Sequence, residues 1–215
     1  DNVVNSEAEA FETARRFLSY LPASVHELPE REQPNDTPDR REESLISIVP
    51  TDGKTPYKPR KIVEATVDKG SFFEIGHDWG RGIVCGFARL DGYPVGILAG
   101  DPFFLDGAWT ADVCDKVARH MDLCSQFHLP VVHFVDCPGF AVGVKAETAG
   151  VTRAGVRAMT AIYQADVPVC SVVIRKAYGL AGSAMMNQSR TKWRYCWPSG
   201  DWGSLPMAGG IEAAF

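Results

Sequence analysis

The fold of this chain is decided by two stretches of sequence, VVHFVDCPGF (Val131–Phe140) and VPVCSVVIRKAYGLAGSAMM (Val167–Met186). Each is an apolar run that ends in a glycine-containing turn, and such a run is typical of a strand buried on both faces. A turn at the end of a strand leaves backbone N–H groups unpaired. Two such turns side by side could bind an anion through peptide N–H groups rather than through acidic, basic or nucleophilic side chains.

Length and composition fit one domain of moderate size with an additional arm. The chain has 215 residues, is 45% hydrophobic and has a formal net charge of −5 with a pI near 5.5. This acidic balance argues against nucleic acid as the main partner. No apolar run approaches the ~20 residues that span a bilayer, and the polar segment Asp1–Glu12 has no secretory signal. We therefore expect neither a nucleic-acid partner nor a membrane partner.

The six cysteines contain no Cys-x-x-Cys pair and no ligand spacing typical of zinc. Cys85, Cys137 and Cys170 lie inside or beside apolar runs. We therefore predict buried thiols in a reducing compartment, and no metal site.

Residues 1–50 are predicted to form a helix and a connector arm, ahead of a domain at 51–215. Ser6–Leu21 has a helical pattern, and Ser6 with Glu9 resembles a capping box. The inward face of this helix is predicted to contain Phe11, Ala14, Arg15 and Leu18. The segment Pro29–Glu43 is charged and contains prolines, which is typical of a solvated connector.

The rest of the chain alternates strand and helix patterns, an order typical of an α/β fold. The dipeptide Asp91-Gly92 joins two apolar runs and predicts a hairpin, because it favours a type I′ turn. The predicted helices are Tyr57–Val67, Thr110–Phe127 and Thr152–Gln164. The predicted strands are Phe72–Ile75, Gly82–Leu90, Tyr93–Ala99, Val131–Val135 and Pro168–Ile174.

Two of these helices have apolar stripes that we expect to face inward. The stripes are Val113, Val117, Met121 and Cys124 in one helix, and Val156, Met159, Ile162 and Tyr163 in the other. The segments Arg194–Trp197 and Gly209–Phe215 indicate the start of a further strand–helix unit, so the domain is predicted to be truncated at its C-terminus.

The turn within Ala177–Met186 (AYGLAGSAMM) is the first candidate for chemistry. Gly179 would let the chain turn after the strand, and Leu180 and Ala181 would present N–H groups at the start of a helix. Such a pair can hold an oxyanion, which is worth about 3–4 kcal/mol per donor. The alternative is a plain strand-to-helix turn packed with small residues, and the pattern alone leaves both open.

The first turn, Asp136–Gly143 (DCPGFAVG), offers a second set of backbone groups. Pro138 removes one donor, and Gly139 permits close approach of a ligand. Asp136 is expected to brace the turn rather than to act as an acid or base. Neither a Walker phosphate loop nor a G-x-G-x-x-G motif after a strand occurs in the chain.

Side chains give weaker indications of chemistry. Ser183 is the hydroxyl nucleophile candidate in the second turn, although it lacks a G-x-S-x-G frame. His133 is expected to be a core residue. Arg175 and Lys176 are predicted to close the strand, where they would attract an anionic tail or pair with surface carboxylates. Four aromatic residues that alternate like a strand face are expected in the core or at a subunit interface: Trp193, Tyr195, Trp197 and Trp202.

Three separated motifs, in this order, resemble the carboxyltransferase (β) subunits of acyl-CoA carboxylases, with the propionyl-CoA and methylmalonyl-CoA carboxyltransferases nearest. The motifs are FFEIGHDWGRGIVCGFARLDGYPVGILAGDP, VVHFVDCPGFAVG and SVVIRKAYGLAGSAM. The resemblance extends over nearly the whole chain and includes the FLSYLP arm. It implies a crotonase-like β-β-α spiral, with this chain corresponding mainly to the C-terminal of two such domains.

The resemblance also implies cofactor, partners and compartment. Biotin would arrive as carboxybiotin on a separate carrier, supplied by a biotin carboxylase subunit, and acyl-CoA would be the substrate. The protein would be a homo-oligomer with its active site at the subunit interface. The compartment would be the bacterial cytoplasm or the mitochondrial matrix.

Matched onto this sequence, the family places its biotin-side oxyanion donors at Leu180 and Ala181. Its biotin-binding residues correspond to Pro138, Gly139, Phe140 and Gly179, and its acyl-chain selector corresponds to Ser183. Two positions depart from the family pattern. Leu180 replaces a glycine, and Gly182 replaces a tyrosine or asparagine, so the resemblance does not fix the acyl chain.

Three functions besides carboxylation remain open from sequence. One is a biotin-linked acyl-CoA decarboxylase or transcarboxylase on the same scaffold. Another is a ClpP-like serine hydrolase that uses Ser183. The last is a non-catalytic assembly domain in which Leu180 has destroyed the site.

Overall fold

A computed structural model describes residues 2–34, 36–184 and 193–206 of the chain. The helices are α1 (Glu7–Leu18), η1 (Glu43–Ile46), α2 (Pro59–Thr66), η2 (Leu105–Gly107), α3 (Ala111–Gln126), α4 (Val144–Thr148), α5 (Val151–Gln164) and α6 (Gly179–Ala184). The strands are β1 (Phe73–Ile75), β2 (Ile83–Leu90), β3 (Tyr93–Gly100), β4 (Val131–Cys137), β5 (Val169–Tyr178), β6 (Trp193–Cys196) and β7 (Asp201–Gly203). The predicted helices and strands that fall within the described residues are therefore confirmed, although some of their ends differ.

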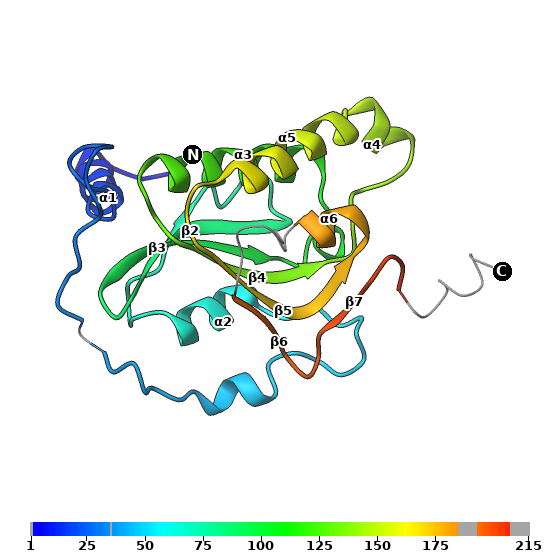
Figure 1. The fold of residues 1–215 in the computed structure, drawn as a ribbon, viewed down its shortest axis with the longest axis horizontal. Helices are drawn as coiled ribbons and strands as arrows, with labels where there is room; N and C mark the ends of the chain where they lie inside the picture. The colour runs from blue at the N-terminus through cyan, green and yellow to red at the C-terminus, as the bar shows by residue number, and fades with distance from the viewer. Residues whose placement is uncertain (1, 35, 185–192, 207–215) are drawn as a thin grey trace.

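These strands form one seven-stranded sheet in the order β1-β2-β3-β4-β5-β6, with β7 also paired to β5. The pairs β1–β2 and β2–β3 are antiparallel, and the later pairs are parallel. Helices α3 and α5 cover one face of the sheet, and α2 lies on the other (Figure 1). Both faces are buried, which explains why β4 and β5 are continuous apolar runs in the sequence.

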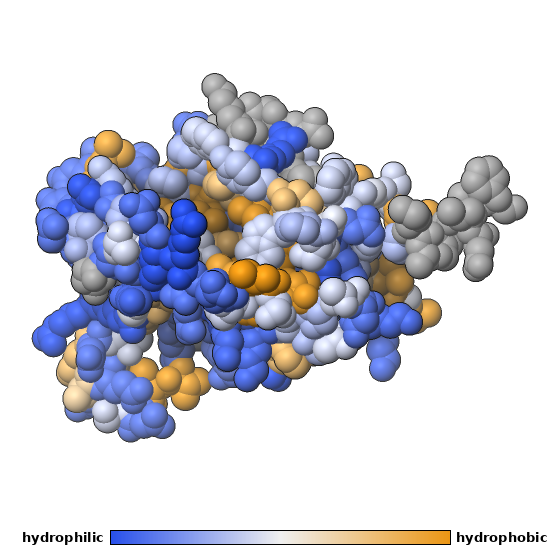
Figure 2. Space-filling view, turned by 90° about the horizontal axis from the view of Figure 1, so that it is seen from below, coloured by the Kyte–Doolittle hydropathy of each residue, from blue (hydrophilic) through white to orange (hydrophobic). Residues whose placement is uncertain are grey.

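The larger core lies between the sheet and α3, and the predicted stripe of α3 is confirmed. Val113, Val117, Met121 and Cys124 are all buried in it. The side chain of Thr110 accepts a hydrogen bond from the backbone N–H of Val113 and so caps the helix. The smaller core lies on the α2 face, where the molecular surface is mostly hydrophilic with apolar residues gathered towards the middle (Figure 2).

The predicted hairpin is also confirmed. Asp91 and Gly92 both have positive φ, +50° and +79°, as a type I′ turn requires. This turn pairs Leu90 with Tyr93 and fixes the register of β2 against β3.

The N-terminal helix begins as predicted, but the residue that it turns towards the domain differs from the prediction. Ser6 Oγ accepts a hydrogen bond from the backbone N–H of Glu9 at 3.2 Å. Phe11 and Leu18 are exposed, so their predicted inward position is wrong. Instead, the ring of Phe17 packs against Phe87, with ring centroids 5.6 Å apart. No residue of α1 is fully buried, and the helix contacts the sheet through Phe17. The positions of Phe73 and Phe87 on the sheet therefore decide which face of the helix turns inward.

The connector lies across the hairpin and the end of α2. The side chain of Arg31 binds the carbonyl oxygen of Asp91 at 2.7 Å. Arg40 donates a hydrogen bond to the carbonyl oxygen of Ala65 at 2.9 Å, which satisfies a carbonyl group at the C-terminal end of α2. The arm is thus attached to the domain by arginine side chains and backbone carbonyl groups.

The predicted inward stripe of α5 is only partly right. Ile162 is buried, but Val156 and Tyr163 are exposed. The helix instead turns its small residues inward, where Gly155 lies so close to the ring of Phe140 that an added Cβ would be 2.8 Å from it. Small residues allow α5 to approach the domain closely, and that requirement overrides the apolar stripe.

The last strands correct the predicted end of β5 and exclude the core as the location of three aromatic residues, while their predicted alternative location at a subunit interface stays a prediction. Strand β5 continues to Tyr178 rather than ending near Ile174, because its final residues pair with β7. Strand β6 is confirmed, but Trp193, Tyr195 and Trp202 are exposed and so are not core residues. The predicted unit at Gly209–Phe215 lies outside the described residues.

Candidate functional site

The two predicted turns lie side by side at the carboxyl ends of β4 and β5. These strands are parallel neighbours, and Cys137 pairs with Ala177 at their ends. A Cβ placed on Gly139 would lie 4.0 Å from the carbonyl oxygen of Tyr178. The two turns therefore do lie side by side, which is the arrangement that an anion site built from both of them requires.

The second turn is built by two glycines with different tasks. Gly179 has φ +62° and redirects the chain from β5 into α6. Gly182 lies against β5, where an added Cβ would be 2.4 Å from the carbonyl carbon of Ala177. The residue that departs from the family pattern at 182 is thus what allows α6 to lie close to the strand.

The leucine that replaces a family glycine does not distort this turn. Leu180 is absent from the described non-glycine residues with positive φ, so its backbone adopts an ordinary conformation. Its side chain is 69% exposed, whereas Ala181 is fully buried beneath it. Leu180 therefore changes the surface of the turn and leaves its backbone path intact.

A cavity of about 580 Å³ opens beside this turn. Its lining consists of Ala177, Gly179, Leu180, Ser183, Trp202, Gly203 and Ser204. Three of the predicted site residues, Gly179, Leu180 and Ser183, thus meet at one cavity. Ala181 is fully buried and is not among the lining residues.

The first turn flanks this cavity without lining it. The carbonyl oxygen of Gly139 accepts a hydrogen bond from the backbone N–H of Trp109 at 3.0 Å. The ring of Phe140 packs edge-on against Trp109, with centroids 6.0 Å apart, and rests on Gly155. The side chain of Phe140 therefore holds the turn against the domain, a role that the sequence did not indicate.

A buried ion pair connects the strands behind the two turns. Asp136 accepts hydrogen bonds from Arg175 Nε and from the backbone N–H of Lys176, each at 3.1 Å. Burial raises the pKa of Asp136, and the guanidinium of Arg175 opposes that rise. Asp136 therefore braces the turn, as predicted.

Of the two roles predicted for Arg175 and Lys176, pairing with carboxylates is confirmed, whereas their predicted position at the end of the strand is wrong. Neither residue ends the strand, and Arg175 is buried rather than poised at the surface. Both pair with Asp106, a residue that sequence reasoning missed. Asp106 has φ +55°, and an aspartate before a glycine is typical of such a conformation, which was the available signal.

The described side chains give little support to a hydrolase. No described histidine is hydrogen-bonded to Ser183: His77 binds Asp78, His128 binds the carbonyl oxygen of Val25, and His120 contacts Cys124. His133 is buried within β4, as predicted, and burial lowers its pKa to about 3. Within residues 2–34, 36–184 and 193–206, no histidine is therefore in place to act as the base for Ser183.

Two other features are absent from the same described residues. They contain no cluster of metal-ligating side chains. They also contain no helix with the length and apolar character needed to cross a bilayer.

Comparison with known proteins finds a match to the carboxyl transferase domain over residues 1–215. A propionyl-CoA carboxylase carboxyltransferase subunit of Haloferax mediterranei is 35% identical over 98% of this chain and 41% of its own length. A methylmalonyl-CoA decarboxylase subunit alpha of Veillonella parvula is 34% identical over 98% of this chain and 42% of its own length.

Among solved structures, the hexameric transcarboxylase 12S with methylmalonyl-CoA and methylmalonic acid bound has a TM-score of 0.89 and 35% identity. The match covers 95% of this chain and 39% of that one. The likeness confirms the crotonase-like α/β fold that the resemblance implied. This chain spans about two fifths of the length of the Haloferax and Veillonella relatives, 41% and 42% respectively.

Proposed function

This chain belongs to the carboxyl transferase domain family, and on that premise we propose that its full-length protein is a biotin-dependent acyl-CoA carboxyltransferase. The carboxyl group of carboxybiotin would pass to the α carbon of an acyl-CoA. One observation carries the proposal: the turns at Pro138–Phe140 and Gly179–Ala181 lie side by side at the carboxyl ends of parallel strands. We infer that this chain supplies the biotin-side half of the site.

The cavity beside Leu180 suits the ring system of biotin, which is uncharged. The residues that line it carry no ionisable side chain, and Leu180 and Trp202 give it apolar surface. A ureido oxygen is a neutral acceptor that gains charge during carboxyl transfer, and peptide N–H groups are suitable donors to it. Pro138, Gly139 and Gly179 would shape the path by which biotin reaches the cavity. Phe140 would support the first turn by packing behind it.

In the proposed mechanism, the N–H groups of Leu180 and Ala181 would donate hydrogen bonds to that oxygen as its charge develops. Carboxybiotin supplies the carboxyl group when it is bound. Leu180 and Trp202 limit the access of water, which strengthens the hydrogen bonds. Ser183, exposed at the cavity, would contact the acyl chain and influence its selection.

Partners and assembly follow from the same proposal. The acyl-CoA, the biotin carboxyl carrier and the biotin carboxylase would meet this chain near the two turns. Val142 and Val144, which follow Phe140 in the chain, are exposed, as are Leu180 and Trp202 at the cavity. Exposed apolar surface marks interaction sites when it is contiguous, and it would be covered in a homo-oligomer with the active site between subunits. Six free cysteines support a reducing compartment, the bacterial cytoplasm or the mitochondrial matrix.

The reverse direction is the second candidate. The similarity to a decarboxylase subunit from Veillonella parvula favours it, because the same donors would stabilise the same oxygen in either direction. Exchange of labelled carboxyl groups between carboxybiotin and a series of acyl-CoAs, measured with the full-length protein, would separate the two. Net carboxylation of an acyl-CoA supports the first, and net loss of carboxyl from a malonyl-type thioester supports the second.

The decisive experiment is Leu180→Pro in the full-length protein, with Leu180→Ala as its matched control. Proline removes one N–H donor, and the first turn of a helix tolerates it. We expect kcat to fall about 10²–10³-fold in the proline variant, with an unchanged circular dichroism spectrum. The alanine variant should retain most activity. Equal activity in both folded variants would refute the donor role.

Activity and biotin-binding measurements on the same full-length protein distinguish a carboxyltransferase from a serine hydrolase and from a non-catalytic assembly domain. Ser183→Ala should change the preference among acyl-CoAs while carboxyl transfer persists, whereas a hydrolase would lose all activity. A folded oligomer that fails to bind biotin would favour the assembly domain.

A further inference from the structure

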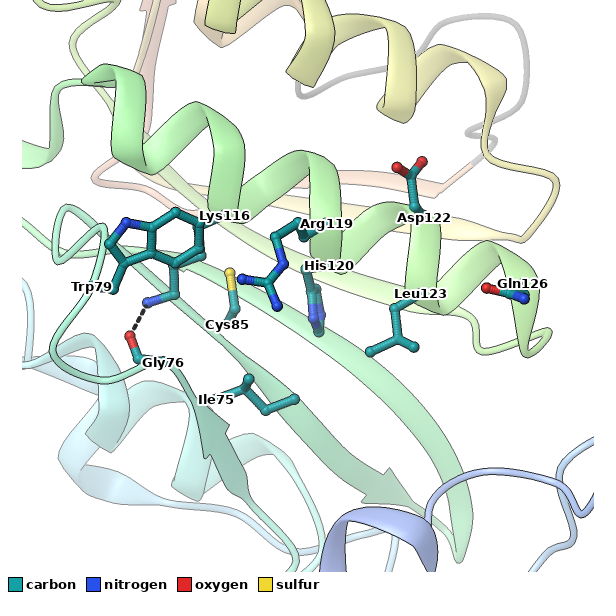
Figure 3. Close-up of a pocket in the computed structure, with 10 residues that line it drawn as sticks. All are labelled: Ile75, Gly76, Trp79, Cys85, Lys116, Arg119, His120, Asp122, Leu123 and Gln126. Atoms are coloured by element: carbon teal, nitrogen blue, oxygen red, sulfur yellow. Dashed lines mark hydrogen bonds between the residues drawn. The ribbon is translucent and has the colours of Figure 1, made fainter. Parts of the chain in front are cut away.

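A second cavity, of about 330 Å³, lies between β1 and α3 and shares no lining residue with the candidate site (Figure 3). It is formed on one side by α3, which contributes side chains from successive turns, and on the other by Ile75 at the end of β1. Its size is at the lower end of the range of small-molecule sites, about 300–1,000 Å³.

The walls of this cavity are mainly apolar and neutral. Ile75, Leu123 and the ring of Trp79 supply hydrocarbon and aromatic surface. Burial raises the pKa of the Cys85 thiol to about 12 and lowers the pKa of His120 to about 4. Both side chains are therefore uncharged at neutral pH, which leaves Lys116, Arg119 and Asp122 as the ionised residues of the lining.

One end of the cavity holds a buried lysine. Lys116 is only 4% exposed, and its Nζ donates hydrogen bonds to the carbonyl oxygens of Gly76 at 2.8 Å and Ile83 at 3.0 Å. An ammonium group has three donors, and these carbonyl groups accept two. Burial lowers the pKa of Lys116, and the nearby carboxylates of Glu74 and Asp101 partly oppose that change. An anion in the cavity would favour the ammonium form further.

A second cation, Arg119, lies at the opening of the cavity. The guanidinium of Arg119 lies 5.4 Å from the ring centre of Trp79, and Figure 3 shows it reaching from α3 across the cavity towards Cys85. Asp122 is the carboxylate at this rim, and it is exposed to solvent on the next turn of α3. Solvent screens its repulsion of an anion more strongly than it screens the attraction of the buried Lys116.

We propose that this cavity is a binding site for a small monocarboxylate with an apolar body. The carboxylate is bound by Lys116 and Arg119, and the hydrocarbon part packs against Ile75, Leu123 and Trp79. The ionised side chains of the lining, Lys116, Arg119 and Asp122, sum to one positive charge, which matches a single negative charge on the ligand. A phosphate ester, with its higher charge and its polar sugar or base, would leave polar groups unpaired against these walls.

The test is calorimetric titration of the full-length protein with octanoate, and with 1-octanol as the uncharged analogue. Octanoate should bind more tightly than octanol by about tenfold or more, since a charge-assisted hydrogen bond contributes that much. Arg119→Gln should weaken octanoate by about tenfold, and Leu123→Trp, which fills the cavity, should abolish binding of both ligands.

Arg157→Gln, an exposed arginine on α5, is the matched control and should bind octanoate like the unmodified protein. Circular dichroism verifies that each variant is folded. Absence of octanoate binding, equal affinity for octanol, or unchanged affinity in folded Arg119→Gln and Leu123→Trp would overturn the proposal. None of these measurements uses carboxyl transfer, so the result is independent of the proposed function.

Discussion

Asp136 Oδ2 and Arg175 Nε lie 3.1 Å apart, and the two side chains are only 1% and 4% exposed. Asp136 is near the end of β4 and Arg175 lies within β5, so the ion pair joins the two strands that carry the candidate site. Arg175 also donates a hydrogen bond to the carbonyl oxygen of Thr55 at 3.1 Å. The pair therefore connects the site to the segment that precedes α2.

Arg175→Met should lower the free energy of unfolding by about 3–5 kcal/mol, because it leaves the carboxylate of Asp136 buried without its partner. Urea unfolding followed by circular dichroism measures this loss. The control is Arg157→Met, which breaks an exposed pair with Asp115 and should cost less than about 1 kcal/mol. Similar small losses in both variants would contradict the structural importance of the buried pair.

Gly182→Ala should destabilise the second turn, because the new Cβ would lie 2.4 Å from the backbone of Ala177 and α6 would have to move away from β5. We expect the free energy of unfolding to fall by about 1–3 kcal/mol, and carboxyl transfer to fall with it. Ser183→Ala, one residue further along, adds no atom to the packing and should change stability by less than about 0.5 kcal/mol. Wild-type stability of Gly182→Ala would show that α6 does not lie so close to the strand.

Stability should decrease as the pH falls from about 6.5 towards 4. Burial lowers the pKa of His120 to about 4 and that of His133 to about 3, while unfolded histidine titrates near 6.5. In this window the unfolded chain binds protons that the folded chain does not, so unfolding becomes easier by up to about 1.4 kcal/mol per pH unit for each histidine.

Urea unfolding at several pH values tests this dependence. His133→Gln should reduce the slope, whereas His77→Gln, at an exposed position, should leave it unchanged. A slope that is the same in all three proteins would contradict the assignment to buried histidine.

The cysteines should divide into classes of different reactivity. Cys85, Cys114, Cys124 and Cys137 are buried, whereas Cys170 is half-buried and Cys196 is exposed, so the sequence prediction of buried thiols is wrong for the last two. A thiol-specific reagent should modify Cys196 first in the folded protein, and Cys196→Ser should remove that fast phase. Rapid modification of any of the four buried thiols in the Ser variant would contradict this division.

Local patterns predicted most of the elements, because their signals lie within a few residues. The helical spacing of the apolar residues from Val113 to Cys124 identifies the buried face of α3. The dipeptide Asp91-Gly92 favours a type I′ turn by its own backbone preference, whatever surrounds the hairpin. The candidate turns were found in the same way, since a glycine after an apolar run ends a strand. Their adjacency comes from the parallel pairing of β4 with β5, which the structure shows.

The sequence by itself determined the strands, helices and turns of this protein, since backbone propensity and hydrophobic period act over neighbouring residues. Only the tertiary structure decided that Phe17 rather than Phe11 faces the sheet, that Phe140 packs over Gly155, and that Arg175 is buried. Each depends on a surface supplied by residues far away in the chain. Close packing selects the side chain that fits that surface, and a short pattern contains no information about it.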